Sequence, residues 1–210
     1  MTKIFVHGTG HRAASWRGTL SHMKDAGEVL CPDLGSLLGG REAAYSNLYA
    51  SFAEYCDGIG GPVDLCGLSL GGVLALEYAL EHPENVRSLA LIGTPYKVPK
   101  GAFALQNVVF RFLPKPAFEG MAFGKRGTIA LTNSLKDMDL SGRLGEVKCP
   151  TLIVCGERDR ANMEPARYLA ENIKGARLRV IEGAGHVVNE EAPEALAGVL
   201  EEFFGGVEGR

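Results

Sequence analysis

Gly67-Leu68-Ser69-Leu70-Gly71 is the stretch that decides the fold of this 210-residue chain. An apolar run with strand character, residues 62–67, leads into it, and a run with helical character, residues 70–81, follows. A Gly-x-Ser-x-Gly pentapeptide between a strand and a helix forms a sharp turn that exposes the serine hydroxyl at a sheet edge. The glycines leave room for that turn, because a Cβ at either position would collide with it. Such a short motif also arises by chance, so its context carries the prediction.

Strand-like and helix-like segments alternate on both sides of this motif. The other predicted strands are residues 3–7, 28–31, 87–93, 151–156 and 177–182, and the other predicted helices are residues 16–26, 42–57, 164–173 and 193–204. Alternation with near-continuously apolar strands predicts an α/β fold in which about six parallel strands carry helices on both faces. A chain of this length forms one domain with a sizeable core and is too short for two.

Residues 96–148, called the insert below, break the alternation. The insert combines an irregular pattern with prolines and aromatic residues: Pro99, Pro114, Pro116, Phe103, Phe110, Phe112, Phe118 and Phe123. It is too long for a simple connection, so we expect a cap inserted into a core made of residues 1–95 and 149–210. The insert holds nine Lys and Arg against four Asp and Glu, whereas the rest of the chain is net acidic. Two interpretations stay open: a cap with solvated cations, or a cap that attracts an anionic substrate.

Composition excludes several classes of function. The net charge of −3 gives no global basic signature for nucleic acid. No apolar stretch reaches the roughly 18 residues that span a bilayer. The first residues, Met1-Thr2-Lys3, lack the pattern of a secretory signal, so a cytoplasmic location is expected. Five cysteines without metal-ligand spacing predict buried, reduced thiols and no metal site: Cys31, Cys56, Cys66, Cys149 and Cys155.

Two further segments complete a candidate catalytic set with Ser69. A serine hydroxyl needs a base, and the base needs a carboxylate that orients it. Asp159 follows the predicted strand 151–156, and His186 follows the predicted strand 177–182. Both therefore lie past the carboxyl ends of strands, where doubly wound sheets place their chemistry. Three other carboxylates stay open as alternatives for the acid: Glu157, Asp137 and Asp139.

Acyl transfer also needs backbone N–H groups that stabilise negative charge on the carbonyl oxygen. One expected donor is the N–H of Leu70, the residue after the serine. The other is expected from the loop His7-Gly8-Thr9-Gly10, most directly from Thr9, with His7 fixing the loop by hydrogen bonds. His11 and Arg12 follow this loop directly, and each is either a candidate for substrate contact or a solvated residue. Phe103 and Phe110 are the candidate substrate-binding residues of the insert.

Four segments together resemble the signature segments of the α/β-hydrolase superfamily, in its order: His7-Gly8-Thr9-Gly10, Gly67-Leu68-Ser69-Leu70-Gly71, Gly156-Glu157-Arg158-Asp159 and Gly183-Ala184-Gly185-His186. The resemblance implies Ser69 as nucleophile, Asp159 as acid and His186 as base, with Thr9 and Leu70 as oxyanion donors. The chain is most similar to small esterase and lipase-like members with a short cap. That likeness implies hydrolysis of a small carboxylic ester or thioester substrate without a cofactor.

Two other functions stay open at this point. The same triad supports hydrolysis or lyase cleavage of a carbon–carbon bond in an anionic substrate, which the positive insert and Arg12 would suit. A ligand-binding protein on a hydrolase scaffold is the third interpretation. Such proteins usually lose a member of the triad, and this chain keeps all three.

Two features depart from the pattern of the family. The family commonly has two strands before the His-Gly loop, whereas this chain begins almost at that loop, which would leave residues 28–31 as an exposed sheet edge. An exposed edge invites pairing or cover, so we expect either a homodimer through this strand or a covering loop from residues 34–41. Many members also follow the second strand with Asp-x-Pro-Gly-x-Gly. Here Pro32-Asp33-Leu34-Gly35-Ser36 stands instead, and its contribution to the rim of the pocket is left open.

Overall fold

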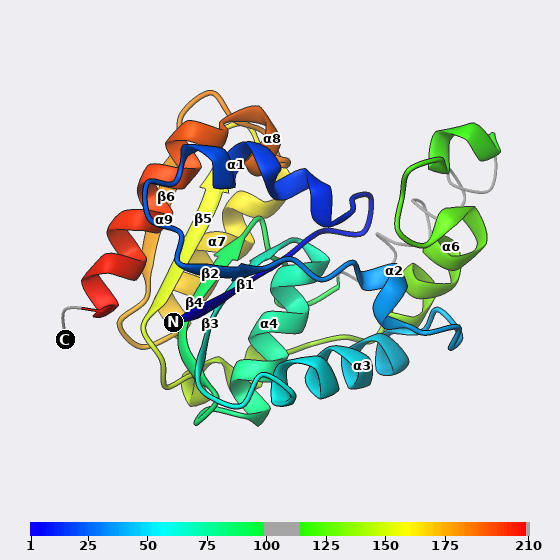
Figure 1. Ribbon diagram of the computed structural model, residues 1–210, viewed down its shortest axis with the longest axis horizontal. Helices are drawn as coiled ribbons and strands as arrows, with labels where there is room; N and C mark the ends of the chain where they lie inside the picture. The colour runs from blue at the N-terminus through cyan, green and yellow to red at the C-terminus, as the bar shows by residue number, and fades with distance from the viewer. Residues whose placement is uncertain (99–113, 209–210) are drawn as a thin grey trace.

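The computed structural model describes residues 1–98 and 114–208, and within them six strands form one parallel sheet (Figure 1). The strands are β1 (Thr2–Val6), β2 (Glu28–Leu30), β3 (Val63–Leu68), β4 (Val86–Ile92), β5 (Thr151–Gly156) and β6 (Arg177–Ile181). Their order is β2-β1-β3-β4-β5-β6, and every neighbouring pair is parallel. The predicted α/β fold is confirmed, and each predicted strand boundary lies within one residue of the observed one.

Helices cover both faces of the sheet (Figure 1). One face carries α1 (Arg17–His22), α8 (Val188–Glu191) and α9 (Pro193–Glu208), and the other carries α3 (Tyr45–Asp57), α4 (Leu70–Glu81) and α7 (Arg160–Asn172). A 3₁₀ turn, η1 (Ala13–Trp16), leads into α1, so the predicted helix over residues 16–26 is shorter than expected. The predicted helix 164–173 begins four residues earlier, because the Asp159 side chain caps it by accepting from the backbone N–H of Asn162.

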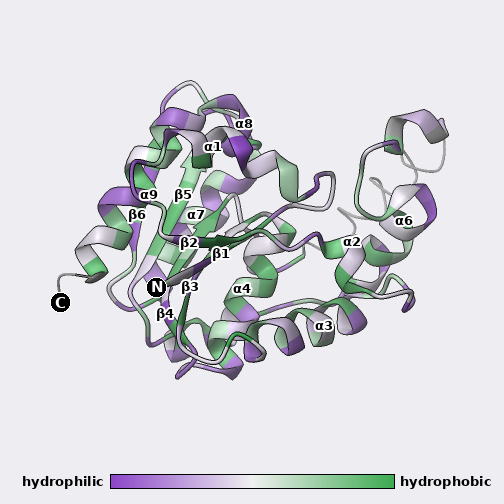
Figure 2. Cartoon of the chain, viewed as in Figure 1, coloured by the Kyte–Doolittle hydropathy of each residue, from purple (hydrophilic) through white to green (hydrophobic). Residues whose placement is uncertain are grey.

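Side chains of the strands alternate between two apolar layers. Ile4 and Val6 of β1 enter the layer under α3, α4 and α7, whereas Phe5 enters the layer under α1 and α9. Phe5 meets Trp16 there edge to face, with ring centroids 5.1 Å apart. This is the period of two expected of strands covered on both sides. Figure 2 shows the buried strand β5 mostly in green, the colour of hydrophobic residues. The five cysteines are free, and all except the half-buried Cys31 are buried, as expected.

Strand β2 lies at the edge of the sheet, as predicted. Among the described strands it pairs with β1 alone. The short helix α2 (Leu34–Leu37) packs against α3 and sends Leu34 and Leu38 into the core there. Residues 34–41 therefore add no strand to this edge in the part of the chain that the structure describes. The homodimer through β2 and the covering loop from residues 34–41 both stay predictions.

The described part of the insert contains η2 (Lys115–Phe118), α6 (Gly124–Ser134) and η3 (Ser141–Glu146). Helix α6 packs against α3, and a bridge between Lys97 and Asp139 joins the two ends of the insert. Phe103 and Phe110, the predicted substrate-binding aromatic residues, lie outside the described residues. None of the described helices is both long enough and apolar enough to cross a membrane.

A buried ion pair links the amino-terminal parts of β3 and β4. Asp64 is fully buried, and its carboxylate accepts hydrogen bonds from Arg87 Nε at 3.0 Å and from the Ser88 hydroxyl.

We expect Asp64→Ala to lower the free energy of unfolding by about 3–5 kcal/mol, because it removes the carboxylate that neutralises a mostly buried guanidinium. Urea unfolding measures this loss. Asp137→Ala is the control, since Asp137 is exposed, and its change is expected within about 0.5 kcal/mol. A loss below about 1 kcal/mol for Asp64→Ala would contradict the argument.

Candidate active site

Ser69 sits on a strained turn between β3 and α4. Its φ of 53° and ψ of −115° make it the single non-glycine residue with positive φ among those described. The turn is held on both sides: the N–H of Ser69 donates to the carbonyl of Ile92 at 2.8 Å, and its carbonyl accepts from Val73 at 3.0 Å. A backbone of this kind costs about 1–3 kcal/mol and persists where the surroundings impose it. The predicted sharp turn at the carboxyl end of β3 is therefore present.

The two glycines that flank this serine are needed for space. An ideal Cβ on Gly67 would lie 2.3 Å from the carbonyl oxygen of Gly71. A Cβ on Gly71 would lie 2.2 Å from the carbonyl oxygen of Val6 in β1. Both distances are far below any real contact of a Cβ with backbone. The expected role of the glycines is confirmed, and Gly71 is also the point where α4 crosses closely over β1.

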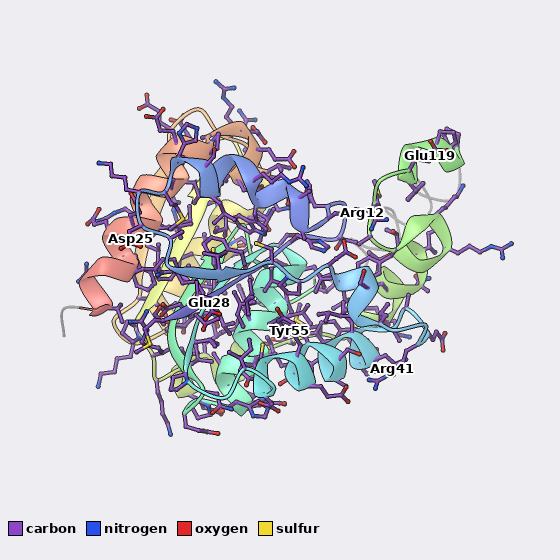
Figure 3. All side chains as sticks on the ribbon, in the orientation of Figure 1. Arg12, Asp25, Glu28, Arg41, Tyr55 and Glu119 are labelled. Atoms are coloured by element: carbon purple, nitrogen blue, oxygen red, sulfur yellow. The ribbon has the colours of Figure 1, made fainter. Side chains whose placement is uncertain are left out.

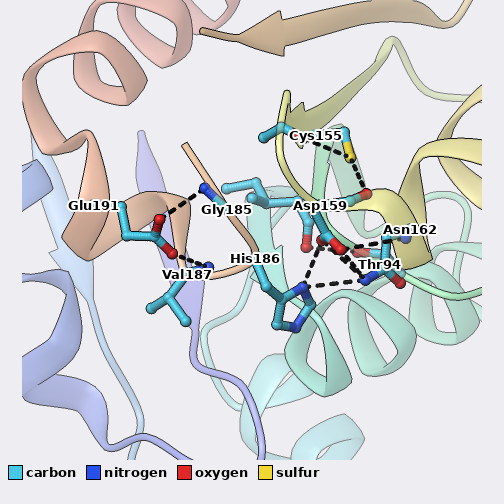
Figure 4. A network of polar contacts seen from close by, with 10 residues as sticks. Thr94, Cys155, Asp159, Asn162, Gly185, His186, Val187 and Glu191 are labelled. Carbon is cyan, nitrogen blue, oxygen red and sulfur yellow. Dashed lines mark hydrogen bonds and ion pairs between the residues drawn. The ribbon is translucent and has the colours of Figure 1, made fainter. Parts of the chain in front are cut away.

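His186 and Asp159 form a direct pair beside this turn (Figure 4). His186 Nδ1 lies 2.7 Å from Asp159 Oδ2, with Asp159 almost buried and the His186 ring 40% exposed. The other carboxylates considered for the acid lie elsewhere. Glu157 accepts from the backbone N–H of Gly183, Asp139 accepts from Ser141, and Asp137 is exposed beside Lys136. Of the four candidates, the structure brings Asp159 to the histidine.

The environment of Asp159 favours its ionised form. Burial alone would raise the pKa of this carboxyl. The hydrogen bonds from His186 and Asn162 outweigh burial and hold the pKa of Asp159 below its ordinary value. The carboxylate is therefore charged at neutral pH and is able to stabilise a positive charge on the His186 ring.

Asn162 is a site residue that the sequence analysis missed. Its Nδ2 lies 3.0 Å and 2.9 Å from the two carboxylate oxygens of Asp159, and 3.2 Å from His186 Nδ1. Asn162 occupies the first turn of α7, three residues after the capping Asp159. An amide at that spacing from a candidate acid was the signal available in the sequence. Its side-chain amide therefore contacts both oxygens of the carboxylate, and its backbone N–H contacts Oδ1 as well.

Glu191 is a second residue that sequence reasoning missed. Its carboxylate accepts from the backbone N–H groups of Gly185 at 2.7 Å and Val187 at 3.1 Å, the residues on either side of His186 (Figure 4). A side chain in α8 thus fixes the loop that carries the histidine. No spacing rule pointed to this contact.

The loop after β1 lies directly beside Ser69. An ideal Cβ on Gly8 would be 3.4 Å from the Cβ of Ser69, so the backbone of this loop approaches the serine closely. The fully buried His7 anchors the loop: its Nδ1 donates to the Gly8 carbonyl at 2.8 Å, and its Nε2 accepts from the N–H of Leu34 at 3.0 Å. Burial lowers the pKa of His7, which keeps the ring neutral and able to accept. The hydrogen bonds expected of His7 are therefore present.

A cavity of about 520 Å³ opens over Ser69. Its floor includes Ser69, His186, Leu70, Thr9 and His11. Its walls come mainly from the insert and α7 and are mostly apolar: Val98, Met121, Thr128, Leu135, Met138 and Pro165. Burial lowers the pKa of His11, and the neighbouring His186 lowers it further while Glu190 opposes this.

Arg12, a candidate either for substrate contact or for a solvated position, has a side chain that is 49% exposed. It does not line this cavity in the part of the chain that the structure describes. Its guanidinium donates to the backbone carbonyls of Gly120 and Met121 in the insert, at 2.9 Å and 3.2 Å, and lies 3.4 Å from Asp33. The structure thus brings together Ser69, Asp159, His186, Thr9, Leu70 and His11 and directs Arg12 toward the insert.

Comparison with known proteins shows the family of this chain. Residues 4–199 match the family model described as the alpha/beta hydrolase family. A pimeloyl-[acyl-carrier protein] methyl ester esterase from Neisseria meningitidis is 30% identical over a region covering 70% of this chain and 71% of that protein. A proline iminopeptidase from Saccharolobus solfataricus is 24% identical over 67% of this chain, and the match spans only 61% of that relative's length.

Solved structures extend the likeness over nearly the whole chain. A thermophilic esterase from Thermogutta terrifontis, solved with malate bound, superposes with a TM-score of 0.82 at 21% sequence identity. The superposition covers 99% of this chain and 90% of the esterase. At that level of identity the likeness concerns the fold. With its fold, strand order and family model in agreement, the chain belongs to the alpha/beta hydrolase family.

Proposed function

We propose that this protein is a serine hydrolase that cleaves carboxylic esters or thioesters through an acyl-enzyme. The observation that carries the proposal is the 2.7 Å contact between His186 and Asp159, at a cavity that also holds Ser69 on its strained turn. A base oriented by a buried carboxylate, beside a partly exposed serine, is the arrangement that activates a hydroxyl. The esterase from Neisseria meningitidis acts on an ester by its name, which favours the same bond here.

In the proposed reaction, Ser69 Oγ attacks the carbonyl carbon while His186 Nε2 takes the hydroxyl proton. Asp159 stabilises the imidazolium that forms. The N–H groups of Thr9 and Leu70 donate to the oxyanion, and each such donor stabilises the transition state by about 3–4 kcal/mol. His186 passes its proton to the leaving oxygen or sulfur, and the acyl-enzyme remains. A water molecule deprotonated by His186 then releases the acid and restores the serine.

The walls of the cavity support an apolar acyl or alcohol group in the substrate. The insert supplies Val98, Leu135 and Met138 to these walls, so we infer that it acts as the cap over the site. His11 lies on the cavity floor next to His186 and is the remaining candidate for direct substrate contact from the loop after β1. Burial keeps this ring neutral, as suits an uncharged ester.

Cleavage of a carbon–carbon bond in an anionic substrate remains the alternative. Its support in the sequence was Arg12 and the positive charge of the insert. The Arg12 guanidinium is engaged by two backbone carbonyls and Asp33, so Lys97 is the one lysine or arginine among the described residues that line the cavity. The mostly apolar walls around it favour the ester interpretation. A ligand-binding protein on this scaffold is disfavoured, since Ser69, Asp159 and His186 are all retained.

Turnover of p-nitrophenyl esters from acetate to decanoate tests the proposal, together with labelling by a fluorophosphonate. We expect turnover of at least part of the series and labelling at Ser69. Folded protein that neither turns over esters nor reacts with the fluorophosphonate would overturn the proposal. Labelling without turnover of any ester would indicate a working triad with a different substrate, and anionic carbon–carbon substrates would be tried next.

Asn162 provides a graded test of the acid–base pair. We expect Asn162→Ala to lower kcat/KM about tenfold, since one hydrogen bond to a charged group contributes about 1.5–3 kcal/mol. Asn162→Asp should cost more, because a second carboxylate beside Asp159 raises the pKa of both. Asn172→Ala at the exposed end of the same helix is the matched control and should leave kcat/KM unchanged. Equal activity of Asn162→Ala and the wild type would contradict a positioning role for Asn162.

A further inference from the structure

We propose that Arg12 is a positioning residue that locks the insert onto the loop carrying the oxyanion donor, and thereby sets selectivity for long acyl chains. The contact region of the insert, residues 120–122, is called the seam below. The inference rests on the proposed ester hydrolysis and deepens it. It assigns Arg12 to the enzyme's own backbone and not to the substrate.

The Arg12 guanidinium donates three hydrogen bonds. Nε donates to the Gly120 carbonyl at 2.9 Å, Nη2 donates to the Met121 carbonyl at 3.2 Å, and Nη1 donates to Asp33 Oδ2 at 3.4 Å. A planar guanidinium is suited to this, because its donors are fixed in one plane and reach several acceptors at once. Figure 3 shows Arg12 between the core and the insert, at the side of the core that faces the seam.

Asp33, the N-cap of α2, and Gly35, in the first turn of α2, fix the same seam. Asp33 Oδ1 accepts from the N–H of Ser36 and caps α2, which leaves Oδ2 directed at Arg12. An ideal Cβ on Gly35 would lie 2.2 Å from the carbonyl oxygen of Ala122, so the two backbones touch here. This is the stretch Pro32-Asp33-Leu34-Gly35 whose contribution to the rim the sequence left open.

The contacts of Arg12 with the seam join two segments that border the candidate active site. Arg12 is three residues beyond Thr9, and Met121 on the other side lines the cavity. Leu34, the first residue of α2, donates its N–H to His7, which anchors the oxyanion loop. Movement of the seam would therefore alter the wall that Met121 contributes to the cavity, whereas Ser69 is held by its backbone bonds to Ile92 and Val73. A long acyl chain reaches that wall, whereas an acetyl group ends near the serine.

Steady-state kinetics of Arg12→Ala on p-nitrophenyl acetate and decanoate test this. We expect KM for decanoate to rise about tenfold, with kcat/KM for acetate changed less than about twofold, because a small displacement of a substrate-holding wall is costly. Arg12→Lys should resemble Arg12→Ala, since an ammonium lacks the fork. Added guanidinium ion should partly restore Arg12→Ala. Gly35→Ala, whose added methyl group would displace Ala122, should shift selectivity the same way.

Hydrogen exchange provides a readout independent of activity. In Arg12→Ala, amides of peptides covering residues 119–123 should exchange faster, with those of α4 unchanged. Arg126→Ala, an exposed residue of α6, is the matched control and should change neither exchange nor selectivity. Unchanged exchange at the seam overturns the proposal whether or not the ester hydrolysis holds. Equal losses on acetate and decanoate in Arg12→Ala would overturn it as well. So would full activity of Arg12→Lys together with a loss in Arg12→Ala, because that result would indicate that Arg12 recognises an anion directly. Absence of Ser69-dependent turnover in the wild type refutes the ester hydrolysis alone.

Discussion

Replacement of Ser69 by alanine is expected to lower kcat/KM on p-nitrophenyl esters by about 10⁴-fold or more. The hydroxyl oxygen is the atom that bonds to the acyl carbon in the proposed reaction, and alanine offers no substitute. The cavity and the donors from Thr9 and Leu70 stay in place, so a small residual rate over water is expected. Steady-state assays with the same esters, and loss of fluorophosphonate labelling, measure the effect.

Ser69→Gly separates chemistry from folding at the same position. The φ of 53° is strained for serine and relaxed for glycine. Relief of about 1–3 kcal/mol of strain should exceed the roughly 0.5–1 kcal/mol that glycine costs in conformational entropy. We therefore expect Ser69→Gly to be inactive and to unfold at higher temperature than the wild type. Ser21→Ala, at an exposed serine of α1, is the control for both measurements.

The outcome that would contradict the assignment of Ser69 as the nucleophile is a Ser69→Ala variant that keeps a tenth of the wild-type activity.

The strands and the turn around Ser69 were predictable because their signals are local. Continuous apolar runs bounded by Gly and Pro locate buried parallel strands to within a residue. The pentapeptide carries its own steric reason, which the approach of Gly67 to Gly71 confirms. Asp159 and His186 were predictable by position, since each follows a strand at the same edge of the sheet.

Contacts between distant loops were outside the reach of such signals. The Arg12 guanidinium meets Gly120 across 108 residues of sequence, and a charged loop residue looks the same whether it contacts substrate, solvent or backbone. Asn162 was missed because the polar first turn of α7 carries no helical periodicity and Pro165 lies inside the helix. The role of Glu191 depends on how α8 packs against the His186 loop, and no spacing in the sequence specifies that packing.

Gly71→Ala is expected to lower the free energy of unfolding by about 4 kcal/mol or more, the range of exceptional single substitutions. The added methyl group would lie 2.2 Å from the Val6 carbonyl oxygen and 2.8 Å from that of His7. Val6 belongs to β1, which pairs with β2 and β3, so its carbonyl is not free to move aside. Either α4 lifts from the sheet and exposes apolar surface, or the β1–β3 pairing is disturbed at the residue before the oxyanion loop.

The matched control for this substitution lies in α9. Gly198 is also a helical glycine, but nothing lies within 4 Å of an added Cβ there. Gly198→Ala should therefore stabilise the protein by up to about 1 kcal/mol, through better helix propensity alone. Urea unfolding of the two variants separates crowding at the α4–β1 crossing from any general effect of alanine. If Gly71→Ala were as stable as Gly198→Ala, α4 would have to stand farther from β1 than the structure places it. The steric account of the turn that carries Ser69 would then fail with it.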